Sequence, residues 1–573
     1  MPLQRMRYAA WVSATLFTFV VAGCGDKASS DGPNANSAGS GQNNAGAGTA
    51  GGSGGMPGAA GGGVTPGGGD AAVGGSGGPG AGGGNGGAPA ACGASDGLKV
   101  TRLDTTAIAM MGKPFDSDAD KTTPWNFSTN YGKPPEIVAL PDGENLDILW
   151  QDHSADPARN QADPNKNAKK AFVVRVEKGA SGYAVTRAYQ VDQLAHIMGF
   201  AKDEAGNYFV ATGVDEDDDL TPDMPGKGMH RPGIAKIIKF DANGCKSLEI
   251  DVDNERAKLD PKSEPVINPM TAATSRMAYH AGRLALVHGI NVDYDPAVQA
   301  RHQKAMTTHL DATTGAATLV SSMWVSHSFD QRLFYDGTGF LEVHLGDAYP
   351  RSIALGRFNE QKDKTNTKTY ELFKPKGDLG NNNTFTRLGG VAQVAAGDLG
   401  YLVTFTTERG TETANLLNGT RDLAFLRVSR GFAGMSEMGN GFVDGATTQE
   451  VMSAGDAASN KLTWLTDYAA DAAQADRPRM AAIGGDQFVV LWERWTGTGD
   501  RMATFGGTQG LLLAGDGTVK VMPKQVTQHH LSRGDDVVTL GAQALLVTGD
   551  GTAKKLTLNL IGADLTPMSV DLP

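Results

Sequence analysis

Cysteine is scarce in this sequence. Its three cysteines stand at positions 24, 92 and 245 of 573 residues, which is too few for a disulfide-rich scaffold or a cysteine-based zinc site. Acidic residues outnumber basic ones, and the formal net charge is −12. A chain with this charge is not expected to bind nucleic acid.

The motifs of several common catalytic sites are also missing. The sequence has no His-Glu-x-x-His zinc motif, no Gly-x-Ser-x-Gly nucleophile turn and no phosphate-binding glycine loop. Motifs therefore leave open whether the protein is an enzyme.

A hydrophobic run occupies positions 8–22, after the basic residues Arg5 and Arg7. The run is short for a permanent membrane span and is typical of an export signal. It ends in Val21-Ala22-Gly23-Cys24, which resembles the lipobox of bacterial lipoproteins. This resemblance implies a signal peptide at 1–23 and acylation of Cys24. Because Gly25 rather than Asp follows the cysteine, it also implies an outer-membrane or cell-surface location, with the lipid anchor as the only membrane contact.

Residues 24–91 form a low-complexity segment rich in Gly, Ala, Ser, Asn and Pro. A segment with so few large apolar residues cannot offset the entropy lost on ordering, so we expect a disordered tether. Its r.m.s. reach is about 45 Å. Such glycine-rich spacers after a lipobox resemble those of myxobacterial surface lipoproteins.

The remaining residues, 92–573, contain a repeated pattern of short β-type runs separated by Gly and Asp turns. It is clearest at 479–518, where Gly484-Gly485-Asp486 separates two apolar runs and Gly515-Asp516-Gly517 closes a third. Seven such repeats start near 136, 196, 276, 332, 387, 479 and 536. The fourth strand of the fifth repeat is undefined between Gly431 and Leu465.

This rhythm predicts an all-β fold, a seven-bladed β-propeller with four-stranded blades, which we expect to be monomeric. A pair of β-sandwiches is the alternative, but radial closure better explains the repetition and leaves fewer exposed sheet edges. Residues 97–130 precede the first repeat. They could pair with the last blade and close the ring, or cap one end.

Long connections gather on one face of the predicted ring. In a propeller, the loop between the second and third strands of each blade lies on the same face as the loop entering the next blade. The second-to-third connections are long in blades 1, 2, 3 and 5, at 155–169, 215–233, 291–303 and 408–422. Long loops on one face of a rigid scaffold indicate a binding surface.

An arginine begins the inner strand of four consecutive repeats, and Arg533 matches this position more loosely. These side chains could clamp an anion, but a residue repeated in every blade more often forms an inter-blade ion pair. We therefore interpret the set as structural staples: Arg276, Arg332, Arg387 and Arg479.

Residues that do not repeat are better candidates for a ligand site. The fourth blade concentrates two histidines, a tyrosine, an arginine and an aspartate near one end, and the first blade adds an Asp-His pair. A satisfied polar network is the plainer interpretation, but this mixture also suits ligand binding or acid–base chemistry. The candidates are His327, His344, Asp347, Tyr349, Arg351, Asp152 and His153.

Two further features of the sequence give weaker indications, one of a Ca²⁺ site and one of a disulfide. Asp215, Asp217, Asp219 and Asp223 form an acidic loop that could hold Ca²⁺, although the spacing lacks the glycine and terminal glutamate of an EF-hand, and a solvated loop is the default. After acylation of Cys24, Cys92 and Cys245 remain, and they could form a disulfide after export.

Two functions stay open. The first is a surface-tethered binding or scaffold propeller for a glycan, peptide or protein, with its binding face on the long loops and the top of the fourth blade. The alternative is a hydrolase or lyase that degrades an extracellular polymer. It would use paired carboxylates from the set Asp152, Asp347, Glu408 and Glu493.

Overall fold

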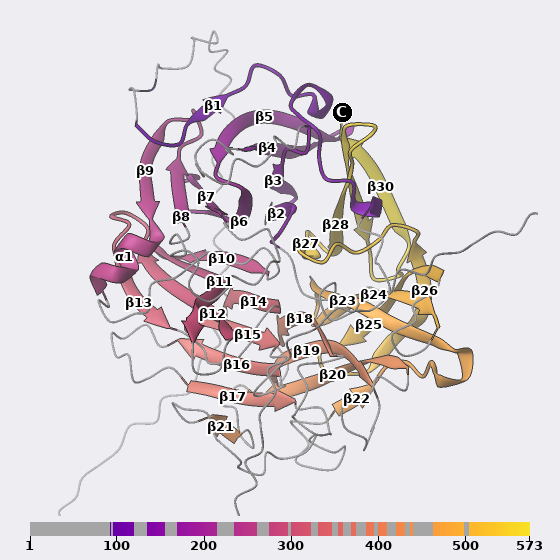
Figure 1. Cartoon of the computed structure of the whole chain (residues 1–573). Coiled ribbons are helices and arrows are strands. Elements are labelled where there is room, and N and C mark those ends of the chain that lie inside the picture. Colours follow the sequence, from indigo (N-terminus) through magenta and orange to yellow (C-terminus); the bar gives the residue numbers. More distant parts are fainter. Residues whose placement is uncertain are drawn as a thin grey trace, which may run out of the picture. The chain divides into compact units, whose positions relative to one another are not determined.

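The computed structural model describes residues 92, 96–119, 134–154, 169–214, 234–259, 274–295, 300–321, 330–345, 353–358, 368–373, 386–394, 399–408, 420–429, 436–438, 462–497 and 504–572. They belong to one compact unit, 90–573, in which seven antiparallel sheets are arranged as the blades of a β-propeller (Figure 1). The predicted fold is confirmed.

Each blade is a meander whose strands follow one another from the axis outward. The strands are, in blade 1, Ile137–Asp142 (β2), Asn145–Gln151 (β3), Lys169–Gly179 (β4) and Gly182–Gln193 (β5); in blade 2, His196–Lys202 (β6), Tyr208–Val214 (β7), Ile234–Phe240 (β8) and Lys246–Asp251 (β9); and in blade 3, Ser275–His280 (β10), Arg283–Asp295 (β11), Ala300–Asp311 (β12) and Ala317–Ser321 (β13). They are, in blade 4, Asp330–Tyr335 (β14), Phe340–Leu345 (β15), Ile353–Phe358 (β16) and Lys368–Phe373 (β17); and in blade 5, Arg387–Gln393 (β18), Leu399–Glu408 (β19), Arg421–Ser429 (β20) and Leu462–Trp464 (β22). They are, in blade 6, Ala473–Gly484 (β23), Gln487–Thr496 (β24), Thr504–Ala514 (β25) and Val519–Thr527 (β26); and in blade 7, Val538–Leu540 (β27), Gln543–Asp550 (β28), Lys555–Ile561 (β29) and Pro567–Leu572 (β30).

Six elements of the described residues lie outside this regular pattern. Val100–Arg102 (β1) pairs with β5 and extends blade 1 outward, and Ser436–Met438 (β21) does the same on β17 of blade 4. The helix Val252–Leu259 (α1) follows β9, and Ile108–Met110 (η1), Ser117–Ala119 (η2) and Ala469–Asp471 (η4) are single 3₁₀ turns. The fourth strand of blade 5 is β22, within the interval that the sequence left undefined.

One predicted loop is wrong. In blade 3 the hairpin continues through most of 291–303, where Asn291 pairs with Gln303 and Tyr294 with Arg301 across a bulge. Paired backbone therefore replaces much of the expected open loop. The other three long connections lie mostly outside the described residues.

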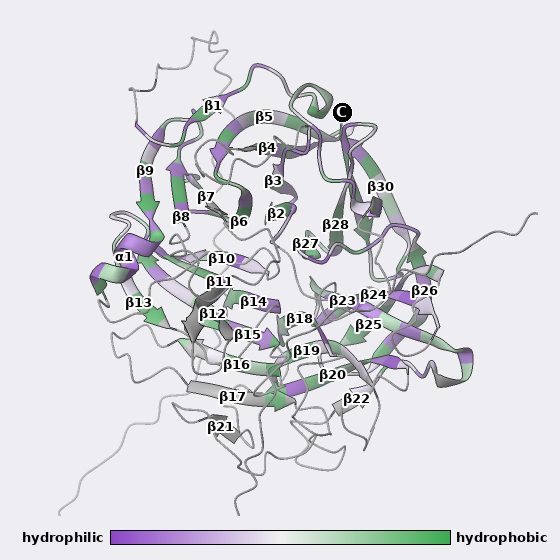
Figure 2. Ribbon diagram, in the orientation of Figure 1, coloured by the Kyte–Doolittle hydropathy of each residue, from purple (hydrophilic) through white to green (hydrophobic). Residues whose placement is uncertain are grey.

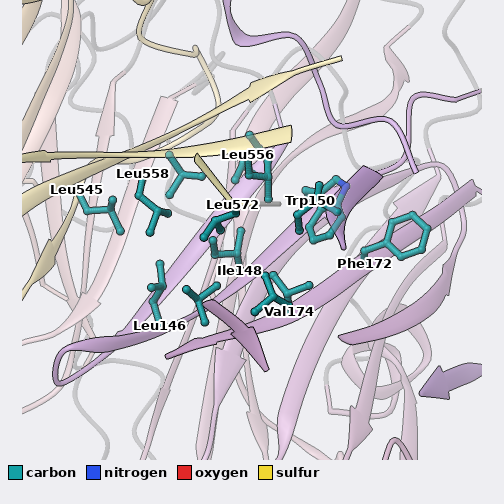
Figure 3. Packing of buried hydrophobic residues seen from close by; sticks show 14 of the residues in the cluster. Leu146, Ile148, Trp150, Phe172, Val174, Leu545, Leu556, Leu558 and Leu572 are labelled. Atoms are coloured by element: carbon teal, nitrogen blue, oxygen red, sulfur yellow. The ribbon is translucent and has the colours of Figure 1, made fainter. Parts of the chain in front are cut away.

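Hydrophobic side chains fill the spaces between neighbouring blades, because the second and third strands of the blades are buried on both faces once the blades pack side by side. Outermost strands such as β26 and β30 remain largely exposed. Figure 2 shows hydrophobic stretches within strands all around the ring. At the junction of blades 7 and 1, Ile148, Trp150 and Phe172 pack with Leu545 and Leu558 (Figure 3). Each fully buried large side chain here contributes about 1.5–3 kcal/mol.

Glycines let inner strands approach closely at two bulges. A Cβ on Gly199 would lie 2.5 Å from the Cβ of Met277 in the next blade, and one on Gly390 would lie 2.5 Å from the Cβ of Met480. Side chains at these positions would push the inner strands of adjacent blades apart.

Among the described residues, no helix is both long and apolar enough to cross a membrane. Positions 1–91, which contain the predicted signal and tether, lie outside the described residues.

Candidate functional site

We call one end of the ring axis the axial end. There the inner strand of each blade begins and its second strand ends. All four repeated arginines lie here, at the starts of β10, β14 and β18 and within β23. Their side chains are mostly buried. A buried guanidinium needs partners, so its contacts decide between a staple and a ligand contact.

Two of these arginines bind the backbone of the following blade. Arg332 Nε donates to the carbonyl of Gly389 at 2.8 Å, and its Nη2 donates to that of Leu388 at 3.2 Å. Arg479 Nε donates to the carbonyl of Asp535 at 2.8 Å. The interpretation of these residues as inter-blade staples is confirmed.

A third junction uses a carboxylate. Asp476 of blade 6 lies 3.1 Å from Arg421 Nη1 and 3.9 Å from Arg387 Nε, both of blade 5. Burial alone would raise the pKa of Asp476, but Arg421 and Arg387 hold it below its usual value. The carboxylate therefore remains ionised and links the two blades.

The fourth arginine makes a longer connection. Arg276 of blade 3 forms a bidentate pair with Asp536, just before the inner strand of blade 7, at 2.6 Å from Nε and 2.9 Å from Nη2. These blades are not neighbours, so the pair spans the axis. Arg332 Nε lies 3.6 Å from the same carboxylate. Against the effect of burial, the two arginines hold the pKa of Asp536 well below its usual range.

The side chain of Asp535, the residue before Asp536, binds blade 1 rather than blade 3. Its Oδ1 accepts hydrogen bonds from the amides of Glu136 at 2.7 Å and Ile137 at 3.0 Å, so it ties blade 7 to blade 1. Burial raises the pKa of Asp535 to about 7, even though these amides favour its charged form. Two consecutive aspartates thus have pKa values shifted in opposite directions.

The predicted pair in the first blade adjoins this group. His153 Nε2 lies 2.8 Å from Glu136 Oε2, and both side chains are partly exposed. Asp152 instead accepts a hydrogen bond from the amide of Lys113 at 3.0 Å and another from Ser154 at 2.8 Å. Asp152 thus organises local backbone, while His153 and Glu136 remain accessible.

We call Glu136, His153, Arg276 and Asp536 the axial site. Asp536 is the most exposed, with 34% of its side-chain surface accessible, and Arg276 the least, with 10%. Two carboxylates, one guanidinium and one imidazole supply both acceptors and donors. The arrangement can bind a hydrogen-bonding ligand, and its His–Glu pair could also transfer a proton.

The remaining predicted residues do not join this site. His344 is completely buried and contacts Glu342, whose other oxygen accepts from Thr307 Oγ1 at 2.5 Å. His344 thus lies buried between blades 3 and 4 rather than at the axial site, and its predicted contact with a ligand stays a prediction. His327, Asp347, Tyr349, Arg351 and the aspartates at 215, 217, 219 and 223 lie outside the described residues, as does the side chain of Glu408.

Glu493, a candidate for the hydrolase, is also buried. It accepts from the Leu531 amide at 2.7 Å and from Trp495 Nε1 at 2.9 Å, and it pairs with Arg477 at 3.3 Å. Within the described part of the chain, no three His, Cys, Asp or Glu side chains gather closely enough to hold a metal ion.

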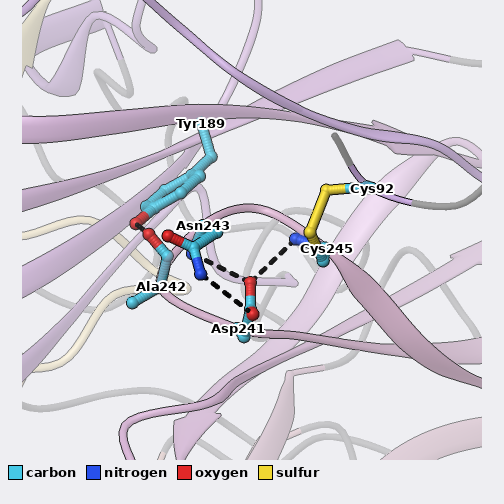
Figure 4. The surroundings of a disulfide bond; sticks show 6 residues. All are labelled: Cys92, Tyr189, Asp241, Ala242, Asn243 and Cys245. Carbon is cyan, nitrogen blue, oxygen red and sulfur yellow. Dashed lines mark hydrogen bonds between the residues drawn. A yellow bond between two sulfur atoms is a disulfide. The ribbon is translucent and has the colours of Figure 1, made fainter. Parts of the chain in front are cut away.

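Cys92 and Cys245 form the disulfide that the sequence allowed (Figure 4). Cys245 lies in the turn between β8 and β9, which places the bond at the end of blade 2 opposite the axial end.

Sequence reasoning missed Glu136, Asp535 and Asp536. A signal was available, because blade 7 carries Asp535-Asp536 just before its inner strand, where four blades carry arginine. At this position of blade 7 the sequence replaces the repeated arginine by aspartates, whose charge is complementary to that of the arginines in the other blades.

No protein family and no curated protein matches this chain. Similar solved structures include xylan β-1,4-xylosidase from Bacillus halodurans C-125, with 13% identity and a TM-score of 0.28 over 59% of this chain and 56% of that one. The parainfluenza virus 5 hemagglutinin-neuraminidase ectodomain is 9% identical, with a TM-score of 0.35 over 70% and 90%. An exo-1,5-α-L-arabinanase from a bovine ruminal metagenomic library is 9% identical, with a TM-score of 0.28 over 57% and 95%. At these values the similarity does not extend to function.

Proposed function

We propose that this protein is a lipid-anchored surface propeller that binds a neutral, hydroxyl-rich polymer, such as a glycan, at the axial site. The observation that carries the proposal is that two partly exposed pairs, Glu136–His153 and Arg276–Asp536, lie at one end of the axis and are linked through Asp535, which accepts from the Glu136 amide. Carboxylate oxygens accept hydrogen bonds from hydroxyl groups, and the His153 imidazole can donate one, while Arg276 holds the Asp536 carboxylate in place. The net charge of −12 disfavours a polyanionic ligand.

The fold supports display of this site away from the anchor. The ordered chain is fastened by Cys92–Cys245 at the end of blade 2 opposite the axial end. Cys92, the residue at which the proposed tether joins the described chain, therefore lies at the end of blade 2 opposite the axial end. A polymer outside the cell can approach the site without passing the attachment point.

Binding is favoured over hydrolysis because two proposed catalytic carboxylates are occupied. Asp152 accepts backbone hydrogen bonds, and Glu493 is buried and bound by four groups, on Leu531, Trp495, Arg477 and His530. Glycosidase carboxylates must instead flank a substrate, about 5–10 Å apart.

The test uses the full chain with Cys24→Ala, so that it can be purified without detergent. We expect retention on a neutral polysaccharide among an array of neutral and acidic glycans. Asp536→Asn and Glu136→Gln should each weaken that binding about tenfold. The matched control is Glu144→Gln, because Glu144 lies in the turn between β2 and β3 at the opposite end of blade 1.

The assay also distinguishes the alternative. New reducing ends or unsaturated products from the bound polysaccharide would identify a hydrolase or lyase. Binding unaffected by either axial-site variant would contradict the proposed site.

A further inference from the structure

Blades 1 and 7 meet without exchanging a strand. Blade 1 contains β2–β5 and blade 7 contains β27–β30, each continuous in sequence. Their junction is held by the shared hydrophobic core and by Asp535, which accepts from the amides of Glu136 and Ile137. A ring closed in this way depends on side-chain packing and a few hydrogen bonds at one junction.

The N-terminal segment 96–119, here called the strap, crosses that junction. It begins on blade 2, where the Leu98 amide donates to Glu249 at 2.9 Å, and then pairs with blade 1 through β1. Ile108 and Met111 enter the core shared by blades 1 and 7. The strap therefore covers the place where the ring closes.

The far end of the strap is fastened by polar contacts. Asp118 lies 3.0 Å from His529 Nδ1 and accepts from the His530 amide at 3.0 Å, while Ser117 Oγ accepts from the Gly549 amide at 3.0 Å. These contacts are few and lie one after another along the chain. A pull on the N-terminal end would break them in turn rather than together.

The disulfide lies upstream of every strap contact. Cys92 is bonded to Cys245, whose turn is braced by hydrogen bonds from the Cys245 amide to Asp241 Oδ1 at 2.9 Å and from Tyr189 of blade 1 to the carbonyl of Ala242 at 2.6 Å (Figure 4). The attachment point is thus a well-supported part of blade 2.

We infer that Cys92–Cys245 carries tension from the N-terminal tether directly into blade 2 and so keeps that tension off the strap. The inference rests on the proposed tether for its biological use, but the path of force follows from the covalent connection alone. A surface protein that holds an extended polymer is pulled between its anchor and its ligand. With the disulfide intact, the strap lies inside a closed covalent loop and stays on the junction of blades 1 and 7.

Single-molecule force spectroscopy tests this on the full exported chain, held at residue 24 and at its C-terminus. The oxidised chain should show no early low-force event. The Cys92→Ser chain should first release about 15 nm at low force, the contour of the roughly forty residues before the first blade. Reducing the wild-type chain after folding should reproduce this event, which guards against a folding defect in the variant.

The same reductant applied to Cys92→Ser is the matched control and should change nothing further. A reduced chain whose first event has the same force and length as that of the oxidised chain would overturn the inference. Glycan retention is measured separately, so failure of the proposed ligand leaves this result interpretable.

Discussion

Arg276 of blade 3 and Asp536 of blade 7 form a bidentate ion pair across the axis of the propeller, although 260 residues separate them in the sequence. The pair joins non-adjacent blades, whereas the staples of Arg332 and Arg479 join neighbours. The axial site is therefore also a structural centre of the ring.

Breaking this pair should destabilise the fold. We expect Arg276→Ala to lower the free energy of unfolding by about 2–4 kcal/mol, because it leaves Asp536 with less compensation in a mostly enclosed place. The value is set below that of a fully buried pair because Asp536 is partly exposed. Denaturant unfolding of both single variants and the double variant gives the coupling energy.

The control is the exposed pair Lys555–Asp571, with 37% and 58% of the side-chain surfaces accessible. Its coupling should be below about 1 kcal/mol. Equal coupling in the two pairs would show that Arg276 and Asp536 are not a structural centre.

The proposed lipid anchor predicts a change in partitioning. Wild-type protein should fractionate with membranes and incorporate labelled fatty acid. Cys24→Ala should do neither, because it lacks the thiol that accepts the lipid. The control is Cys92→Ser, which removes a thiol but leaves Cys24 in place. Membrane partitioning by Cys24→Ala would contradict the lipoprotein hypothesis.

The acidic loop predicts a modest effect of Ca²⁺ on thermal stability. If the aspartates at 215, 217, 219 and 223 hold Ca²⁺, EGTA should lower the melting temperature by several degrees, because a ligand bound only to the folded state stabilises it. Added Ca²⁺ should restore the temperature, and Asp217→Asn with Asp219→Asn should remove both responses. An unchanged melting temperature in EGTA would leave a solvated acidic loop.

The repeat could be predicted from sequence because it depends on local patterns. Turn residues such as Gly484-Gly485-Asp486 and apolar runs such as 488–492 recur in each blade, and all seven blades follow from them. The staples of Arg332 and Arg479 were predictable for the same reason, since both repeat in register and both bind backbone carbonyls of the following blade. The partner of Arg276 was not, because Asp536 lies across the axis.

The axial site was predicted only in part. His153 and Arg276 were among the residues singled out, but their significance depends on Glu136, Asp535 and Asp536. The hydrogen bond from Glu136 to Asp535 joins residues 399 positions apart. Such a contact exists only because the ring closes, and no local pattern encodes it. The sequence could not place His344, because a polar side chain near a strand end can face either solvent or an inter-blade junction, and this one is buried at a junction.

The end of the strap should respond to pH. Its hydrogen bond to Asp118 raises the pKa of His529, and this raised value means that the charged pair stabilises the strap at low pH. The stabilisation should be lost as pH rises through the folded-state pKa of His529. Hydrogen exchange of residues 103–119 should therefore quicken above that pH, after correction for the intrinsic effect of pH.

Asp118→Asn is the control, since it removes the charge but can keep a hydrogen bond. Its corrected exchange should not show the step. The charges of Lys555 and Asp571 also affect the pKa of His529. The exchange of the Asp571→Asn variant is therefore measured as well, to separate their effect from that of Asp118. A step that persists in Asp118→Asn would exclude this pair as its origin.

The consecutive residues Asp535 and Asp536 should respond to pH in opposite directions. The folded-state pKa of Asp535 is about 7, well above the value of about 4 in an unfolded chain. The folded state therefore retains the proton more strongly, and wild-type stability from this group falls as pH rises from 4 to 7. Asp535→Asn keeps an acceptor for the amides of Glu136 and Ile137 but carries no charge. It should match wild type near pH 4 and exceed its unfolding free energy at pH 7 by up to about 4 kcal/mol.

Asp536→Asn provides the opposite sign in the same experiment. Because Arg276 and Arg332 hold the pKa of Asp536 below its usual range, its charge stabilises the fold above about pH 4, and that contribution disappears as pH falls. This variant should be less stable than wild type by a nearly constant amount from pH 4 to pH 7, and it should approach wild type only in stronger acid, as pH falls through the low folded-state pKa of Asp536. Over the range from pH 4 to pH 7, the unfolding free energy of Asp535→Asn should therefore rise above that of wild type, while that of Asp536→Asn stays below it. An Asp535→Asn curve parallel to that of wild type would mean that Asp535 is ionised in the folded ring and that its bonds to blade 1 involve a charged carboxylate.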